Sequence, residues 1–261
     1  MVTPRKVPVA LVTGGARGIG AACAVALARA GFDIAVASLE NENDGSRTMQ
    51  AIRECGRSGV YAAFDVADIA SHAALVEHAE QALGPIDCLV NNAGVSSLVR
   101  GDMLDLTPES FDRSVAVNLR GTFFLTQTVA QRMLRIPARS STAYRSIVTI
   151  TSVNAEIVGE NRADYCMTKA ALSMMSELYA ARLAAEGIHV FEVRPGIIRT
   201  DMTQPATAKY DALIAQGGVP MARWGEPLDV GTAVATLAAG ALPFSTGEIV
   251  NVGGGLHIHR V

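Results

Sequence analysis

Tyr165 and Lys169 stand four residues apart in the segment Y-C-M-T-K, near the start of a long stretch with helical apolar periodicity. On a helix this spacing places both side chains on one face. A free tyrosine has a pKa of about 10, and a nearby ammonium group favours the phenolate, which brings proton exchange closer to neutral pH. Five tyrosines and three lysines would give only about 0.06 such pairs by chance. The pair therefore predicts a group that donates a proton to a carbonyl oxygen.

Two further polar residues are candidates for the same centre. Ser152 ends the apolar segment S-I-V-T-I-T-S, and a hydroxyl at the carboxyl end of a parallel strand lies where open α/β folds bind ligands. A cap for the following turn is the alternative interpretation of Ser152. Asn118 lies within a helical apolar pattern, and a buried amide there needs hydrogen-bond partners. From the residues alone, a satisfied core amide is as good an interpretation of Asn118 as a catalytic one.

A glycine-rich segment, T-G-G-A-R-G-I-G from Thr13 to Gly20, follows the first expected strand and opens the first expected helix. Glycines allow a tight turn there and bring backbone N–H groups close to a phosphate at the helix N-terminus. The segment predicts a dinucleotide site, although its spacing differs from G-x-G-x-x-G and a purely structural turn is the alternative. The predicted contacts are Gly14, Arg17, Gly18, Ile19 and Gly20.

The elements that must position these residues alternate between short apolar runs and longer helix-period stretches, which is typical of βαβ units with a buried parallel sheet. The expected strands are Val7–Thr13, Ile34–Ala37, Val60–Phe64, Ile86–Val90, Ser146–Thr151, His189–Val193 and Glu248–Val252. The expected helices are Ile19–Ala30, Gly45–Glu54, Ser71–Leu83, Pro108–Leu134, Ala163–Ala185 and Pro227–Ala239. We predict an α/β, Rossmann-type doubly wound fold over residues 1–261, a single domain with a seven-stranded parallel sheet flanked by helices.

One stretch, about residues 200–225, shows no regular pattern and is too long for an ordinary connection, so we interpret it as a substrate loop. Its apolar members include Met202, Tyr210, Met221 and Trp224.

Composition narrows the function classes. Hydrophobic residues make up 49% of the chain and charged residues 18%, which indicates a folded core rather than disorder. A net charge of -3 offers no basic field for nucleic acid. The four cysteines are neither paired nor clustered with histidine, so neither a metal site nor a disulfide framework is expected. With no signal-peptide or membrane-length pattern, we expect a cytoplasmic protein without membrane or nucleic-acid partners.

Together the glycine loop, Asn118, Ser152 and the Tyr165/Lys169 pair resemble the short-chain dehydrogenase/reductase family along the whole chain. In overall pattern the sequence is most similar to 3-oxoacyl-[acyl-carrier-protein] reductases. The resemblance implies that Tyr165 is the general acid/base and that Lys169 also hydrogen-bonds the nicotinamide ribose. It implies that Ser152 holds the substrate oxygen and that Asn118 holds a water of a proton relay. Thr151, the neighbouring hydroxyl, has a spacing to Tyr165 that fits the family less well.

The resemblance also implies coenzyme contacts elsewhere in the chain. Asp65 and Val66 match the family's contact to the adenine amino group, and N-N-A-G after the fourth strand matches a second family element. The P-G segment after the sixth strand matches the part that positions the nicotinamide carboxamide. The residues carried over are Asn91, Ala93, Gly94, Pro195, Gly196, Ile198 and Thr200, with Tyr165 and Lys169.

Coenzyme preference depends on charge at the end of the second strand. NAD-preferring relatives usually have Asp where this chain has Ser38, and Arg17 offers a donor fork to a phosphate. These features favour NADP(H), whereas Glu40 leaves NAD(H) possible.

The function implied is NADPH-dependent reduction of a ketone, a 3-oxoacyl thioester or similar carbonyl, by a family that usually forms homotetramers. An acidic acyl carrier would dock on surface arginines such as Arg120, Arg132 and Arg135, although ordinary solvated charges are the alternative. An NAD-dependent alcohol or sugar dehydrogenase is the second reading. A nucleotide-binding regulator without turnover is the third alternative. Such a protein would be expected to carry a different residue at one or more of the four reacting positions, whereas this chain has Asn118, Ser152, Tyr165 and Lys169.

Overall fold

Seven parallel strands form one sheet in the computed structural model, which describes residues 7–136 and 144–259. The order across the sheet is β3-β2-β1-β4-β5-β6-β7. The bounds are β1 Val9–Thr13, β2 Asp33–Ser38, β3 Gly59–Ala63, β4 Cys88–Asn91, β5 Arg145–Ile150, β6 Ile188–Pro195 and β7 Glu248–Val252. The central strands are buried on both faces, which explains why they are almost continuously apolar in sequence. The predicted fold class is confirmed.

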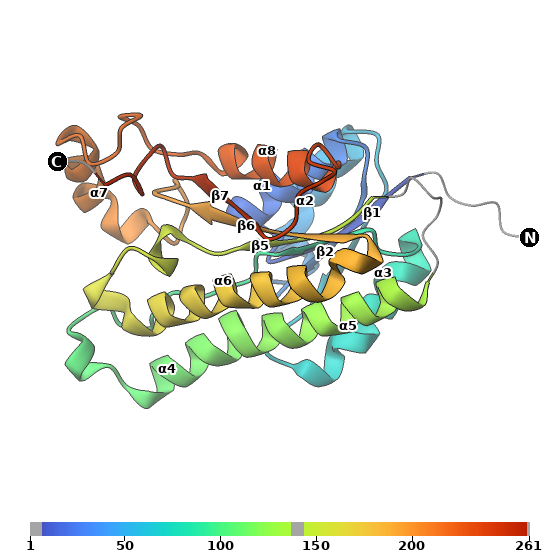
Figure 1. The fold of residues 1–261 in the computed structure, drawn as a ribbon, viewed down its shortest axis with the longest axis horizontal. Helices are drawn as coiled ribbons and strands as arrows, with labels where there is room; N and C mark the ends of the chain where they lie inside the picture. Colours follow the sequence, from blue (N-terminus) through green and yellow to red (C-terminus); the bar gives the residue numbers. More distant parts are fainter. Residues whose placement is uncertain (1–6, 137–143, 260–261) are drawn as a thin grey trace, which may run out of the picture.

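Helices cover both faces of the sheet, as Figure 1 shows. Alternate strand residues face opposite ways, so Ala10 and Val12 pack with one layer whereas Val9 and Leu11 pack with the other. The first layer contains α1 (Gly18–Arg29), α2 (Glu42–Glu54) and α8 (Pro227–Ala238). The second contains α3 (His72–Leu83), α5 (Thr122–Arg135) and α6 (Ala163–Leu183). The result is a three-layer sandwich with its core on both sides of the sheet.

Strands β1 to β3 are added in one direction from the middle of the sheet, and β4 to β7 are added in the other, so the order switches between β1 and β4. All seven strands are parallel, so the segments that follow β1, β4, β5 and β6 leave the sheet at the same edge. Ligands bind at this edge in open α/β sheets. The topology therefore brings the glycine loop, the N-N-A-G segment, Ser152 and the P-G segment together.

The predicted helix Pro108–Leu134 is one rod in space, but it is not uniform. It consists of α4 (Pro108–Ser114), a π-helical segment (Val115–Gly121) and α5, which continue into one another in Figure 1. A Cβ on Gly121 would lie 2.3 Å from the Val66 carbonyl oxygen, so glycine lets the two backbones approach. Such π turns inside helices are frequent at functional sites, and this one contains Asn118.

Two other boundaries differ from the prediction. Helix α2 begins at Glu42 rather than Gly45, because the Asn41 side chain accepts hydrogen bonds from the N–H groups of Asn43 and Asp44. The 200–225 segment is not irregular throughout, since it contains α7 (Thr207–Ala215). Buried Tyr210 and Trp224 pack edge to face with ring centroids 5.7 Å apart and give this segment a small core of its own.

Candidate active site

A cleft of about 630 Å³ runs along the carboxyl edge of the sheet. Its walls come from the glycine loop, the ends of β2 and β3, the segment after β4, the end of β5, α6 and the start of the 200–225 segment. Most residues predicted from the sequence line this one cleft. They are Gly14, Arg17, Gly18, Ile19, Gly20, Ser38, Asp65, Val66, Ala93, Gly94, Ser152, Tyr165, Lys169, Pro195, Gly196, Ile198 and Thr200.

The glycine loop has the shape that a phosphate cradle needs. Gly14 and Gly18 have positive φ angles of 63° and 57°, which L side chains rarely adopt. A Cβ on Gly20 would lie 2.1 Å from the Gly14 carbonyl oxygen, so only glycine fits where the loop folds onto α1. The glycines thus place the N-terminus of α1 at the wall of the cleft. This local geometry and the size of the cleft fit a dinucleotide.

Two predicted residues do not line the cleft. Asn91 is buried, and its Nδ2 donates to the Thr126 hydroxyl at 2.8 Å. Its neighbour Asn92 lines the cleft instead, with its Nδ2 donating to the carbonyl oxygens of Thr13 and Gly14 at 2.9 and 3.1 Å. Because successive strand residues point to opposite faces, the N-N pair divides into one core residue and one residue that fixes the glycine loop.

The other residue outside the cleft is Asn118, which is fully buried behind it. Its Oδ1 accepts from the Val95 N–H at 2.7 Å, and its Nδ2 donates to the Val95 carbonyl at 3.0 Å and the Thr168 hydroxyl at 3.1 Å. Both amide protons are therefore used, and one acceptor position on Oδ1 remains. Asn118 joins the segment after β4 to the helix that carries Tyr165 and Lys169.

Ser152 and Thr151 point to different surroundings. The Ser152 Oγ accepts a hydrogen bond from the Asn154 N–H at 3.1 Å and lines the cleft. The Thr151 hydroxyl donates instead to the buried Glu192 carboxylate at 2.5 Å. Ser152 is therefore the hydroxyl available to a ligand, and it also caps the turn that follows β5.

Lys169 and Tyr165 are brought together on α6, as their spacing predicts. The Lys169 Nζ lies 5.6 Å from the Tyr165 ring centroid and donates to the Ile150 carbonyl oxygen at 2.9 Å. This bond ties α6 to the end of β5, two residues before Ser152. Burial lowers the pKa of Lys169 to about 8, although the negative charge of Glu192 opposes that shift.

The acidity of Tyr165 differs from the sequence expectation. Burial raises its pKa above the ordinary value, while hydrogen bonding with Ser152 and the positive charge of Arg162 pull it down. The ammonium group of Lys169 is not among the causes of this shift, and the desolvation of the buried phenolate is the largest of them. Tyr165 is consequently protonated at neutral pH.

A buried carboxylate that the sequence did not reveal holds the start of α6. Asp164 is completely buried, and its Oδ2 accepts from the Ser110 and Ser114 hydroxyls at 2.9 and 2.8 Å. Its Oδ1 accepts from the Tyr165 N–H at 2.8 Å and from the Ser97 hydroxyl. These four donors outweigh burial and leave the pKa of Asp164 below its usual range. The residue before Tyr165 thus fixes α6 against α4 and the segment after β4.

Glu192 and Arg194 form a second buried group that the sequence did not reveal. Glu192 and Arg194 are two residues apart on β6, so both side chains lie on the face that packs against α6. There the Ser173 hydroxyl donates to Glu192 at 2.7 Å and accepts from Arg194 at 2.7 Å. The two side chains also pair directly, with the Arg194 Nε 2.5 Å from the Glu192 Oε1. Glu192 lies inside the predicted strand His189–Val193 and Arg194 directly follows it, so two opposite charges two residues apart were the available signal.

The end of the cleft beside the glycine loop and β2 contains paired charges. The Arg17 Nε lies 3.0 Å from a Glu40 oxygen, and its Nη1 lies 2.9 Å from an Asp201 oxygen. The Ser38 hydroxyl donates to the other Glu40 oxygen at 2.5 Å, and this bond is the main cause of the lowered pKa of Glu40. Arg17 therefore has two carboxylate partners, and both ion pairs are exposed to solvent.

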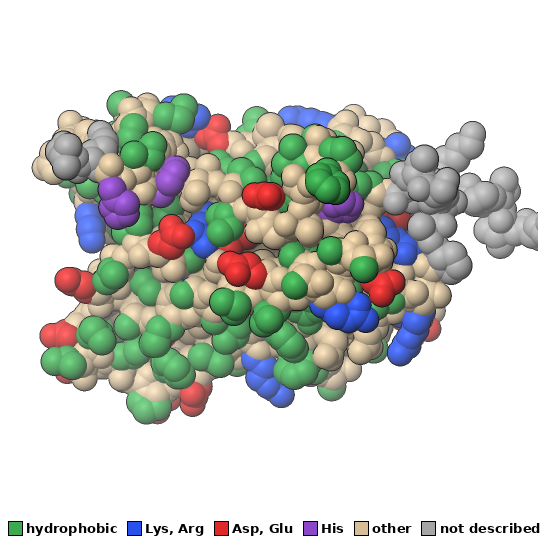
Figure 2. All heavy atoms as spheres, viewed as in Figure 1, with side chains coloured by type: hydrophobic (Ala, Val, Ile, Leu, Met, Phe, Trp, Pro, Cys, Tyr) green, Lys and Arg blue, Asp and Glu red, His purple; other side chains and the backbone are tan. Residues whose placement is uncertain are grey.

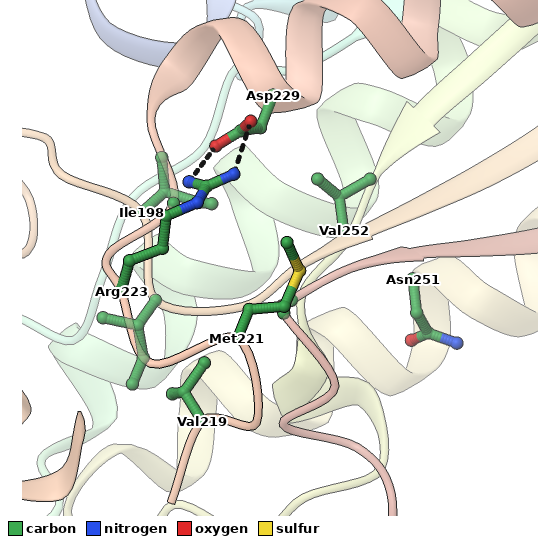
Figure 3. Close-up of a pocket in the computed structure, with 11 residues that line it drawn as sticks. Ile198, Val219, Met221, Arg223, Asp229, Asn251 and Val252 are labelled. Carbon is green, nitrogen blue, oxygen red and sulfur yellow. Dashed lines mark hydrogen bonds and ion pairs between the residues drawn. The ribbon is translucent and has the colours of Figure 1, made fainter. Parts of the chain in front are cut away.

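A second pocket, of about 270 Å³, lies beside the cleft and shares Ile198 with it (Figure 3). The end of the 200–225 segment borders this pocket. Arg223 makes two hydrogen bonds to Asp229 at the start of α8, at 2.7 and 3.0 Å, and the Met221 N–H donates to the Gly254 carbonyl. These contacts fasten the end of the segment to the body of the protein.

Three expected absences can be compared with the described part of the chain. Within residues 7–136 and 144–259 no group of His, Cys, Asp or Glu residues could hold a metal ion. No described helix is long and apolar enough to span a membrane. All four cysteines are free, and Cys23 and Cys88 are buried in the core.

Known proteins share both this sequence pattern and this structure. Residues 14–257 match the family model described as enoyl-(acyl carrier protein) reductase. The crystal structure of a 3-oxoacyl-[acyl-carrier protein] reductase from Brucella melitensis in complex with NAD is 48% identical, with a TM-score of 0.93, and the match covers 98% of this chain and 100% of that chain.

Two curated relatives match over nearly their whole lengths. The 3-oxoacyl-[acyl-carrier-protein] reductase FabG of Staphylococcus aureus is 31% identical, over 95% of this chain and 98% of that protein. The 2-dehydro-3-deoxy-D-gluconate 5-dehydrogenase of Dickeya dadantii is 32% identical, over 95% of this chain and 94% of that protein. The relatives therefore include proteins named for different substrates.

The lowered pKa of Lys169 predicts a pH dependence for any reaction that needs its positive charge. Lys169 is cationic below a pKa of about 8 and neutral above it, so kcat/KM for such a reaction should fall as the pH is raised through that value. Glu192→Gln removes the negative charge that opposes deprotonation and should move this fall to lower pH. The pH profile of kcat/KM for both proteins measures the shift.

Glu156→Gln is the matched control, because Glu156 also pairs with Arg194 but is exposed and does not contribute to the pKa of Lys169. A Glu192→Gln profile that coincides with those of the wild type and this control would contradict the assignment.

Proposed function

The chain belongs to the short-chain dehydrogenase/reductase family, and on that premise we propose that it reduces a ketone to a secondary alcohol with a reduced nicotinamide coenzyme. The observation that carries the proposal is the common wall formed by Ser152, Tyr165 and Lys169 in a cleft of dinucleotide size. Gly196 and Thr200 line the same cleft and would hold the nicotinamide, as the glycine loop would hold the pyrophosphate. A bound coenzyme supplies the hydride for reduction and accepts it in the reverse reaction.

The protein side of the reaction follows from the hydrogen bonds. Ser152 accepts from the Asn154 N–H, and its own proton, which hydrogen-bonds Tyr165 here, would turn to the substrate oxygen when substrate is bound. Tyr165 is protonated at neutral pH and donates its proton to that oxygen as negative charge develops there. Lys169 then stabilises the phenolate, and the unused acceptor position of Asn118 holds a water that returns a proton.

For the substrate we propose a 3-oxoacyl thioester or a similar carbonyl, because relatives named as 3-oxoacyl-[acyl-carrier-protein] reductases match along almost the whole chain. A sugar-acid or alcohol dehydrogenase is the alternative, favoured by the Dickeya relative. Two of the three arginines considered for docking a carrier are engaged within the chain. Arg132 pairs with Glu80, and Arg120 lies 5.8 Å from the Phe124 ring centroid.

We also propose self-association into a homotetramer through the α4–α6 face. Figure 2 shows hydrophobic side chains gathered over the region where Figure 1 places these helices. Three large apolar side chains of α6 are at least half exposed: Met167, Met174 and Leu178. An exposed apolar patch of this kind typically marks a protein–protein contact. Sedimentation velocity of the purified chain would test this assembly.

The pairing of Arg17 with Glu40 supports a coenzyme preference different from the one that the sequence favours. The sequence favours NADP(H), but Glu40 presents a carboxylate beside Ser38 and Arg17 is shared between Glu40 and Asp201. A carboxylate there accepts a hydrogen bond from a ribose 2′-OH and repels a 2′-phosphate. We therefore propose NAD(H) as the preferred coenzyme and NADP(H) as the weaker one.

Glu40→Gln tests this proposal. The wild type should have a higher kcat/KM for NADH than for NADPH, and the variant should shift the ratio toward NADPH by about tenfold, because one charge-assisted hydrogen bond is lost and one repulsion is removed. Steady-state kinetics with both coenzymes give the ratio. A wild-type preference for NADPH would refute the proposal and restore the sequence expectation.

Isotope transfer tests the reaction itself. With coenzyme deuterated at the transferred position of C4 and acetoacetyl thioester as substrate, the alcohol product should carry one deuterium on the carbinol carbon, as mass spectrometry detects. Product alcohol without the label would exclude hydride transfer from the coenzyme to that carbonyl.

A further inference from the structure

Glu192 and Arg194 form a buried ion pair on β6, directly before the cleft residues Pro195 and Gly196. The Arg194 Nε lies 2.5 Å from the Glu192 Oε1, and its Nη2 lies 3.4 Å from the Oε2. Neither charged residue lines the cleft, so neither would touch a ligand there. Moving two charges out of water costs free energy that their attraction scarcely recovers. The pair is therefore better explained by the arrangement that it fixes than by stability.

The carboxylate of the pair holds the residue that precedes Ser152. The Thr151 hydroxyl donates to the Glu192 Oε1 at 2.5 Å, and the Ser173 hydroxyl donates to the Oε2 at 2.7 Å. Ser173 lies four residues after Lys169 on α6, so these two side chains share one face of the helix. One buried carboxylate thus joins the end of β5 to the face of α6 that carries the reacting groups.

The guanidinium group of the pair holds the turn that follows Ser152. The Arg194 Nη1 forms an ion pair with the Glu156 carboxylate, at the end of that turn. Within the turn, the Asn154 N–H donates to the Ser152 Oγ at 3.1 Å, and the Glu156 N–H donates to the Val153 carbonyl oxygen at 3.1 Å. The turn is hydrogen-bonded along its length, and Arg194 fastens its far end to β6.

Ser152 is therefore anchored on both sides by the two members of one ion pair. Its hydroxyl shares the cleft wall with Tyr165 and hydrogen-bonds the phenol. The two hydroxyls belong to different elements, β5 with its turn and α6, so their relative placement depends on contacts that join these elements. A displacement of about 1 Å in a group of this kind can lower a reaction rate by about 100-fold.

We propose that Glu192 and Arg194 are positioning residues for the carbonyl reduction and that they act through Ser152. They hold its hydroxyl where it and the Tyr165 phenol meet the same substrate oxygen. The inference rests on the proposed function, because it concerns the serine that would hold the substrate. Loss of an anchor should lower kcat and leave coenzyme binding intact, since the glycine loop makes no contact with the pair.

The test measures kcat for an acetoacetyl thioester and the Kd of NADH in variants of each anchor. Glu156→Ala and Thr151→Val should each lower kcat by about fivefold, and Arg194→Lys by about tenfold, because lysine keeps the charge but lacks the fork that reaches both carboxylates. Glu156→Gln keeps an oxygen acceptor and should retain most of kcat. The Kd of NADH should stay within about twofold throughout. The Glu156 side chain is 62% exposed, so its variants should keep the fold.

A double-mutant cycle separates positioning from a general structural effect. In a Ser152→Ala background, Glu156→Ala should lower kcat by less than about twofold, because the group it positions is already gone. Glu160→Ala is the matched control, since Glu160 is an exposed carboxylate of the same segment that joins no ion pair in the part of the chain that the structure describes. It should leave kcat unchanged.

Three results would each overturn the positioning role. They are an unchanged kcat in Glu156→Ala, the same fivefold loss in both backgrounds, and an equal loss in Glu160→Ala. A wild type that binds NADH but reduces no thioester, ketone or sugar acid would instead refute the carbonyl reduction itself, and this inference with it.

Discussion

The buried carboxylate of Asp164 is the contact on which the candidate site depends. Three serine hydroxyls and the Tyr165 N–H converge on it, from α4, the segment after β4 and α6. Each hydrogen bond contributes about 1 kcal/mol when made, and a buried donor left without its acceptor costs more than that. Asn118 and Lys169 add bonds to Val95 and Ile150. These bonds fix helix α6, which carries Tyr165, to α4, to the segment after β4 and to the end of β5.

The sequence predicted the parts of the molecule that periodicity and local chemistry control. Seven apolar runs became the seven strands, and the Tyr165/Lys169 spacing placed both groups on one wall. It did not predict the π turn around Asn118, because an extra residue in a helical turn barely changes apolar spacing. It also assigned Asn91 to the coenzyme, whereas Asn92 faces the cleft.

The remaining differences arise from long-range contacts. Asp201 is far from Arg17 in sequence, so nothing near the glycine loop indicated that its charge would be paired. Likewise, the sequence does not show that Asp164 accepts hydrogen bonds from α4 and from the segment after β4, because only the fold brings these elements beside it. The proposed coenzyme preference rests on a charge pair of this kind, whereas the proposed hydride and proton chemistry rests on local motifs. Reaction class is accordingly easier to derive from this sequence than substrate.

The role of Tyr165 as the proton donor is tested most directly by Tyr165→Phe, which removes the hydroxyl but keeps the ring. The account predicts unchanged affinity for the reduced coenzyme and a kcat at least about 100-fold lower, the usual contribution of a general acid. Tyr179→Phe, also on α6 but outside the cleft and bonded to the Phe123 carbonyl of α5, should leave kcat near the wild-type value. A near-normal kcat in Tyr165→Phe, with coenzyme affinity intact, would contradict the assignment of the acid.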